Sequence, residues 1–253
     1  DALPMNDPML ELQWHYKNTG SVMSYRNGAE KGEDINLYPA WNYTAGNPAI
    51  VVAVLDEGVQ YNHPDLEANM WVNVAEQSGA QGVDDDGNGY IDDIYGINAV
   101  MSSGNITWDK YGDTGHGTHV AGIIGGKDNK ITGVAVDTQL VLMKVFPDLS
   151  SGGRTDDILA ALEDAVLLGV DAINMSLGSS CGFAREEDGN KINEVYDRIN
   201  ESGISLITAA SNSYSSAFGG EQGNTNKVTN PDSGTVGSPS TYDAAMSVAS
   251  ISG

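Results

Sequence analysis

The sequence predicts an α/β fold: a mostly parallel sheet with helices on both faces. Short apolar runs end in polar residues or glycine, as strands of buried parallel sheets do. These runs alternate with segments of helical periodicity, which is typical of parallel strands joined by crossover helices. The chain has 253 residues, of which 40% are hydrophobic, enough for one large domain with a buried core.

Apolar runs predict five strands. The first, NPAIVVAVLDEG, ends in an acid and a glycine. The predicted strands cover residues 47–58, 138–146, 170–177, 204–211 and 244–251. Ligands of parallel α/β sheets bind beyond the carboxyl ends of the strands, and Asp56, Ser176 and Asn212 all lie at such ends.

Three segments between these runs predict helices, at 116–126, 155–169 and 190–203. The second begins with Thr155 as its cap and two acids, and it ends at Gly169. The third carries a stripe of apolar residues and ends at Gly203.

The remaining segments predict loops at 17–35, 76–115 and 213–240. No internal repeat or linker divides the chain, so residues 1–253 are expected to form one domain with an N-terminal extension at 1–36.

Charge and composition argue against a nucleic-acid-binding protein and against a membrane-spanning one. The formal net charge is −23, which argues against nucleic acid as a partner, because phosphates require Lys and Arg. The excess of acids suits a protein that binds cations or is secreted. No apolar run reaches about 18 residues, so no membrane span is expected.

The stretch DTGHGTHVAG, residues 113–122, places His116 and His119 among residues with almost no side chains. Glycine and alanine allow other backbone to approach closely. Taken alone, His116 is explained equally well as a histidine at a helix start, and Asp56 as an acid that caps a turn. The two histidines as a metal pair are disfavoured, because zinc hydrolases place such a pair at i and i+4 with a glutamate between.

Four blocks occur in one order with helix-sized spacers: VAVLDEGVQYNHPDL, GHGTHVAG, AINMSLG and ITAASN. Together they resemble the subtilisin-like serine proteases, over residues 37–253. The resemblance implies a subtilisin-like fold and an endopeptidase activity through an acyl-enzyme. It implies that Asp56 is the triad aspartate, that His116 is the general base and that Asn212 is the oxyanion donor. His119 is then a structural residue of the helix.

The same resemblance implies the residues that bind a protein or peptide substrate. Ser176, Leu177 and Gly178 match the strand that pairs with the substrate backbone, and Ser151, Gly152 and Gly153 are expected to supply the facing strand.

The sequence departs from the family pattern at three places. Glu57 follows the aspartate where Ser or Thr is usual, and Ser211 precedes Asn212 where Gly is common. The family's nucleophile lies in a GTSMA-like stretch, and none occurs here. We therefore expect a catalytic domain truncated on its C-terminal side, inactive alone, whose partner is the C-terminal remainder of the same domain.

Other assignments compete with this one. A non-catalytic, calcium-stabilised binding module on a degenerate protease scaffold is the main alternative. GSSCG around Ser180 matches a nucleophile elbow, but that fold places its histidine after the serine, and all four histidines precede it. Cys181 has no dedicated partner, and no G-x-G-x-x-G opens the first strand–helix turn.

An acidic loop, VDDDGNGYIDD at 83–93, predicts a structural Ca²⁺ site. The predicted ligands are Asp84, Asp86, Asn88, Asp92 and the carbonyl of Tyr90, which match positions of an EF-hand loop. The last EF-hand position holds Tyr95 instead of glutamate, so Asp93 or another loop would complete the shell. The plainer interpretation is a solvated turn. Calcium and the family resemblance together predict a secreted or cell-surface protein.

Overall fold

The computed structural model describes residues 8–9, 12–20, 30–107, 115–127, 131–148, 152–179, 190–212, 215–216 and 234–249. Its centre is a six-stranded sheet in the order β2-β3-β1-β4-β5-β8, and every neighbouring pair is parallel. The strands are β1 (Val51–Asp56), β2 (Gly96–Asn98), β3 (Gln139–Lys144), β4 (Ala172–Met175), β5 (Ser205–Ala209) and β8 (Ala245–Val248). The predicted α/β class and parallel sheet are confirmed.

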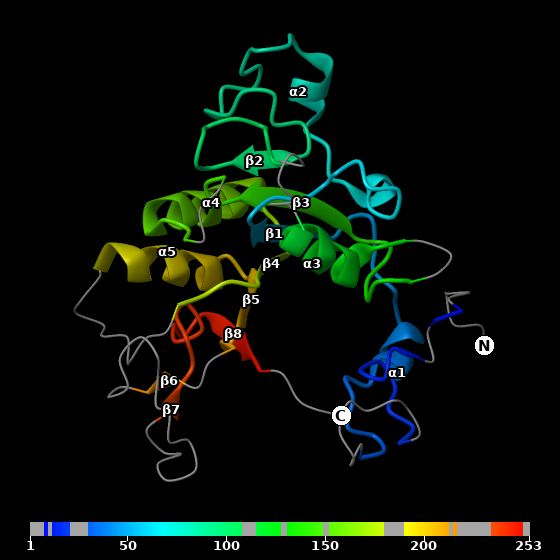
Figure 1. Cartoon of the computed structure of the whole chain (residues 1–253). Coiled ribbons are helices and arrows are strands. Elements are labelled where there is room, and N and C mark those ends of the chain that lie inside the picture. Colours follow the sequence, from blue (N-terminus) through cyan, green and yellow to red (C-terminus); the bar gives the residue numbers. More distant parts are fainter. Residues whose placement is uncertain are drawn as a thin grey trace.

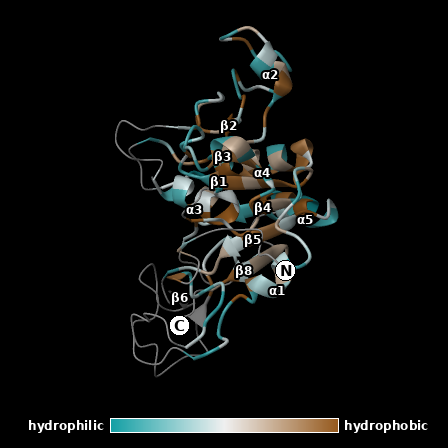
Figure 2. Ribbon diagram, turned by 90° about the vertical axis from the view of Figure 1, so that its right-hand side faces the viewer, coloured by the Kyte–Doolittle hydropathy of each residue, from teal (hydrophilic) through white to brown (hydrophobic). Residues whose placement is uncertain are grey.

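Helices cover both faces of this sheet (Figure 1). The helix α3 (Gly115–Gly125) packs on one face against β1 and β3. The helices α4 (Thr155–Leu168) and α5 (Asn190–Glu201) pack together on the other face. Figure 2 shows brown, hydrophobic residues concentrated in the strands between these helices.

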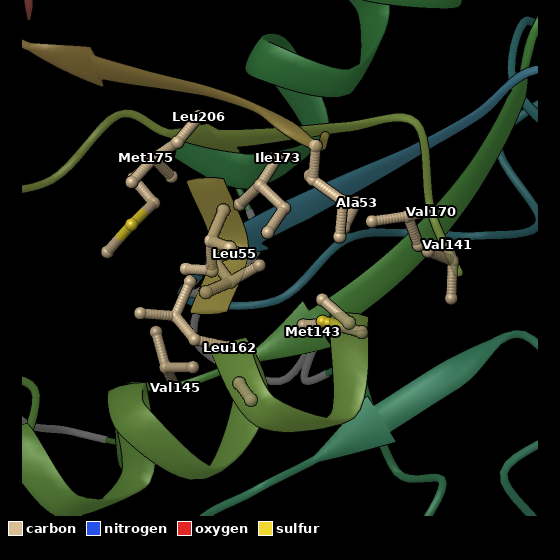
Figure 3. Packing of buried hydrophobic residues seen from close by; sticks show 14 of the residues in the cluster. Ala53, Leu55, Val141, Met143, Val145, Leu162, Val170, Ile173, Met175 and Leu206 are labelled. Atoms are coloured by element: carbon tan, nitrogen blue, oxygen red, sulfur yellow. The ribbon is translucent and has the colours of Figure 1, made fainter. Parts of the chain in front are cut away.

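Successive residues of β1 point into two separate cores. Ala53 and Leu55 belong to the core on the α4 and α5 face, whereas Val54 belongs to the core under α3. Figure 3 shows Leu55 packed with Leu162 of α4 and Met175 of β4. A strand that is covered on both sides has no solvent face, which is why these strands lack an alternating polar pattern.

The ends of α4 agree with the prediction at one terminus only. Gly169 ends the helix in the left-handed conformation at φ 69°, as expected. The prediction of Thr155 as the cap was wrong: Arg154 holds the N-cap position, and no side chain caps the helix there. Arg154 pairs instead with Asp156 in the first turn, where acids also favour the helix dipole.

The predicted loop at 76–115 contains a strand, β2, that the sequence did not indicate. Gly96 allows this strand to lie against β3, since a Cβ atom there would lie 1.9 Å from the carbonyl oxygen of Leu142. Five other short elements, which the sequence also did not indicate, lie in predicted loops and connections. They are α1 (Leu37–Trp41), the 3-10 helix η2 (Glu67–Asn69), α2 (Val74–Ser78), and the antiparallel pair β6 (Ser215–Ser216) with β7 (Gly234–Thr235).

The described part of the N-terminal extension and the helix α1 are anchored to the turn before β3. Tyr16 donates a hydrogen bond to the carbonyl of Thr132 at 3.2 Å, and Trp41 donates one to the carbonyl of Val134 at 2.8 Å. Tyr16, Leu37 and Trp41 bury one another in a small separate core. Within the described ranges, no helix has the length and apolar character needed to cross a membrane.

Candidate active site

Two side chains from distant segments meet at the carboxyl edge of the sheet. Asp56 is the last residue of β1 and is 3% exposed, and His116 is the second residue of α3. The Nδ1 atom of His116 lies 2.8 Å from Oδ1 and 2.9 Å from Oδ2 of Asp56. The structure thus brings together two of the residues that the sequence predicted to act as a unit. We call them the acid–base pair.

Small residues on α3 make this approach possible. Gly117, Ala121 and Gly125 form the buried face of the helix, at spacings of four residues. A Cβ atom on Gly117 would lie 2.2 Å from the Gly58 carbonyl oxygen and 3.1 Å from Oδ1 of Asp56. The stretch GHGTHVAG therefore has almost no side chains because the helix lies directly on the end of β1.

Backbone groups fix both members of the pair. The N–H of Glu57 donates to Oδ1 of Asp56 at 2.8 Å, and the N–H of His116 donates to Oε1 of Glu57 at 2.8 Å. The Glu57 carboxylate therefore lies at the N-terminus of α3, where unpaired N–H groups and the helix dipole favour an anion. Glu57, which departs from the family pattern, thus accepts a hydrogen bond at the start of α3.

The environment of Asp56 acts on its charge in two directions. Burial raises the pKa of its carboxyl group, and this effect dominates. Hydrogen bonds from His116 and the Glu57 N–H, and the positive charges of His116 and Lys144, lower that pKa in part.

Asp56 contacts only one of the two imidazole nitrogens of His116, Nδ1. A carboxylate accepts at Nδ1 when that nitrogen carries the proton, so Nε2 becomes the proton acceptor of the neutral ring. The His116 side chain is 54% exposed, so the ring is open to a reactant. A buried carboxylate that orients an accessible imidazole is suited to general base and general acid catalysis.

Asn212 lies beyond the end of β5, at the same edge of the sheet as Asp56, with β4 between their strands. Its side chain is exposed. Ala210 fixes the segment: its N–H donates to the Val248 carbonyl, and its own carbonyl accepts from Gly237 N–H, both at 2.9 Å. Ser211, which lies between Ala210 and Asn212, has a φ of 109°, a conformation that glycine adopts far more easily.

Four of the predicted substrate-binding residues line one cavity of about 300 Å³: Gly152, Gly153, Leu177 and Gly178. Its other walls are mainly apolar and include Phe146, Ile158, Met175, Tyr196 and Tyr242. Ser176 is not a wall residue; its hydroxyl accepts from Asn174 Nδ2 at 3.0 Å. Ser151, Ser180 and Cys181 lie outside the described residues.

His119 lies apart from the acid–base pair. It lines a second cavity of about 660 Å³ together with His15 and His63. Across the described residues, the one cluster of three or more potential metal-binding side chains includes neither His116 nor His119. The assignment of His119 as a structural residue stays a prediction.

That cluster consists of Glu76, Asp86 and Asp93, whose carboxylate oxygens all lie within 4.8 Å of one another. Glu76 is 4% exposed and Asp93 is 2% exposed. Burial, followed by the negative charges of Asp86 and Glu76, raises the pKa of Asp93 to about 6. Buried carboxylates at this spacing repel one another, and an all-oxygen donor set suits a hard divalent cation. The residues present therefore fit calcium.

The cluster differs from the ligand set predicted from the loop pattern. Asp86 belongs to both. The carboxylate of Asp84 accepts from the N–H groups of the turn at 87–89, and that of Asp92 accepts from Gly82 N–H at 3.0 Å. Asn88 donates to Asp86 and Asp93 at 3.2 and 3.0 Å.

The EF-hand pattern of the loop does not account for the side-chain contacts of Tyr90 and Glu76. The Tyr90 hydroxyl donates to Asp164 of α4 at 2.5 Å, which anchors the loop to the domain. Glu76 comes from α2, before the loop, and its carboxylate accepts from the N–H groups of Asp85 and Asp92 at 2.6 and 2.9 Å. No local spacing signal marks Glu76, because the EF-hand pattern begins eight residues later.

Comparisons with known proteins show which proteins this chain is similar to. Residues 47–253 match the model of the Subtilase family. The chain is 36% identical over 164 residues to subtilisin-like protease 1 of Plasmodium berghei, which covers 64% of this chain and 26% of that protein. It is 33% identical over 240 residues to the PIII-type proteinase of Lactococcus lactis subsp. cremoris, covering 89% of this chain and 12% of that protein.

A solved structure shows the same architecture. The serine protease of Aeromonas sobria, crystallised with a chaperone, superposes with a TM-score of 0.64 at 27% identity. The match covers 85% of this chain and 34% of that protease. The chain thus spans about a third or less of the length of each of these three relatives.

Proposed function

The chain belongs to the subtilase family, and from this premise we propose that it carries the acid–base half of a serine endopeptidase site. The observation that carries the proposal is the contact between Nδ1 of the exposed His116 and both oxygens of the buried Asp56. This contact selects the imidazole tautomer whose Nε2 accepts a proton.

In the proposed reaction, Nε2 of His116 takes the proton of a serine hydroxyl while the serine oxygen attacks the carbonyl carbon of a peptide bond. Asp56 stabilises the imidazolium that forms. The imidazolium then gives its proton to the leaving amine, and the C–N bond breaks to leave an acyl-enzyme. Water repeats the sequence on the ester: His116 takes its proton, the hydroxyl adds to the carbonyl, and the serine leaves with the proton returned.

Asn212 is proposed to stabilise the oxyanion of each tetrahedral intermediate. Its exposed side chain lies at the carboxyl edge of the sheet, near which the reacting carbonyl would bind. An amide that donates to a developing negative charge lowers the transition-state energy more than that of the ground state.

A peptide substrate is proposed to bind as an added strand between residues 176–178 and 151–153. The support is the shared cavity of about 300 Å³ that both segments line, with Leu177 and Gly153 on its walls. The largely apolar walls favour an apolar substrate side chain there.

The nucleophile is proposed to come from outside these 253 residues, because no GTSMA-like stretch occurs among them. The partner is then the C-terminal remainder of the same protease domain, and the chain alone does not hydrolyse peptides. The second candidate is a non-catalytic, calcium-stabilised binding module on the same scaffold, which the carboxylate cluster of Glu76, Asp86 and Asp93 would suit equally well. An intact acid–base pair has no purpose in such a module, which is why we place it second.

Calcium is proposed to bind Glu76, Asp86 and Asp93. Such a cation stabilises a carboxylate cluster and supplies no chemistry to the acid–base pair. A secreted or cell-surface location is part of the same proposal, supported by the family and by the fit to calcium.

The intact mass of the chain, before and after treatment with a serine-directed fluorophosphonate, tests the proposal. The chain alone should show one species of 26.6 kDa without an adduct. A polypeptide with the family's nucleophile stretch should take up the probe when mixed with the chain, and should lose that reactivity with a His116→Ala chain. Equal labelling with and without His116 would leave the binding module as the better account.

A further inference from the structure

A buried lysine lies beside the acid–base pair. Lys144 is the last residue of β3 and is paired in register with Asp56 on the neighbouring strand β1. Its side chain is 2% exposed. The Nζ atom donates to the carbonyl oxygen of Glu57 and lies 3.0 Å from Oδ1 of Asp148.

Burial of a lysine requires compensation. An ammonium group that is removed from water loses favourable hydration, so lysines are almost never fully buried without partners. Asp148 supplies one counter-charge: the oxygen that faces Lys144, Oδ1, is buried, although the side chain as a whole is 28% exposed. A second carboxylate beside the lysine is that of Asp56, on the paired strand, whose pKa the charge of Lys144 lowers.

The contact with Glu57 links Lys144 to both members of the pair. Glu57 follows Asp56 directly and gives it a backbone hydrogen bond, and the Glu57 carboxylate accepts from the N–H of His116. The lysine therefore holds a residue that contacts both Asp56 and the start of α3.

We propose that Lys144 is a positioning residue for the acid–base pair. It fixes the turn after β1 through the Glu57 carbonyl, and its charge favours the ionised carboxylate of Asp56. This proposal rests on the proposed function in one respect: the proposed function gives the ionised Asp56 carboxylate its catalytic role. The contacts of Lys144 do not depend on a nucleophile.

The charge can be tested on the full chain by titration of the Asp56 carboxyl carbon with ¹³C NMR. Among the described residues, the charged and titratable groups that face Asp56 are His116 from α3, Glu57 from the turn and Lys144 from β3. Its partner strand on the other side, β4, ends in Met175 and brings no charge. A change in the Asp56 titration on substitution of Lys144 therefore reports the lysine charge.

Lys144→Met and Lys144→Gln should both raise the pKa of Asp56 above its wild-type value, and Lys144→Arg should leave it unchanged. A merely structural lysine predicts the opposite sign: loosening of the site would admit water to Asp56 and lower its pKa. If Lys144→Met does not fold, Lys144→Gln decides alone, because its amide can still donate to the Glu57 carbonyl. A lowered or unchanged pKa of Asp56 in the folded neutral variants would overturn the charge role.

Hydrogen exchange of the His116 amide tests whether the hydrogen bond from Lys144 to the Glu57 carbonyl fixes the turn after β1. Exchange should be faster in Lys144→Met than in Lys144→Gln, because only glutamine keeps a donor for the Glu57 carbonyl. Equal rates in the two variants would contradict this part of the proposal. Neither measurement needs peptide hydrolysis, so a failure here is distinct from a failure of the protease assignment.

Discussion

Gly117 and Gly58 approach so closely that a Cβ atom at position 117 would lie 2.2 Å from the Gly58 carbonyl oxygen. The same atom would lie 3.1 Å from Oδ1 of Asp56. Backbone cannot retreat as a flexible side chain can, so this contact sets the position of α3 over the end of β1. The distance between His116 and Asp56 depends on it.

Gly117→Ala should therefore displace the start of α3. We expect a loss of at least about 2 kcal/mol in the free energy of unfolding, measured by urea denaturation, since overpacking against backbone is costly. Gly122→Ala in the same helix is the matched control, because its Cβ would meet nothing within 4 Å. That control should gain about 1 kcal/mol from helix propensity. A Gly117→Ala chain as stable as wild type would refute the packing argument.

Ser211 holds a backbone conformation that suits glycine, at φ 109°. Replacement by glycine should remove this strain and raise the free energy of unfolding by about 1 kcal/mol, although glycine loses more entropy on folding. Thermal denaturation of Ser211→Gly beside Ser211→Ala checks the prediction. Alanine keeps the Cβ atom, so only the glycine variant should gain stability. A gain in both variants would mean that loss of the serine hydroxyl, and not relief of backbone strain, stabilises the chain.

Asn69 joins the end of α3 to the turn before β3. It is 8% exposed, and its Nδ2 donates to the carbonyls of Gly125 and Val136 at 2.6 and 2.7 Å. Asn69→Ala leaves two buried carbonyls without a donor and should cost about 2 kcal/mol in urea denaturation. The exposed Asn42 is the control, and Asn42→Ala should stay within about 0.5 kcal/mol of wild type. Similar losses in both variants would contradict the special role of Asn69.

Calcium should stabilise the chain through the buried carboxylates. At a concentration about 100 times its dissociation constant, a cation that binds only the folded state adds about 2.7 kcal/mol. Thermal denaturation in calcium and in a chelator should show this difference for wild type and lose it in Glu76→Gln and Asp93→Asn. The exposed Glu67→Gln is the control and should keep it.

Asp84→Asn separates the two ligand sets in the same assay. The Asp84 carboxylate accepts backbone N–H groups of its own turn and lies outside the cluster. Asp84→Asn should therefore lower stability in both buffers and keep the calcium-dependent difference. Loss of that difference in Asp84→Asn, with retention in Glu76→Gln, would instead favour the EF-hand-like ligands.

Long buried strands were predictable because both of their faces are apolar. The runs around β1 and β3 contain no competing pattern, so their class and parallel pairing follow from the sequence. The strand β2 was not predictable: three residues, Gly96–Asn98, carry no periodicity, and their pairing depends on the close approach of Gly96 to Leu142. The cap of α4 was misassigned because Thr155 has the right side chain but lies one residue inside the helix.

The candidate site shows the same division. Asp56 and His116 were found through local motifs, and the structure brings them into contact. His116 can reach Asp56 because Gly117 packs on the backbone of Gly58, 59 residues earlier in the sequence. This is a tertiary contact, so no local sequence signal marks it. Glu76 was missed for a similar reason, since only the fold brings α2 against the acidic loop. Lys144 was not singled out, because one lysine at a strand end looks like ordinary surface charge.

The imidazole tautomer of His116 tests the central claim most directly. ¹⁵N NMR of the full chain, at a pH where the ring is neutral, should show the proton on Nδ1 and none on Nε2. In Asp56→Asn the amide can donate to Nδ1, so the proton should move to Nε2. A wild-type ring protonated at Nε2, or an unchanged tautomer in Asp56→Asn, would contradict the assignment of Asp56 and His116 as an acid–base pair.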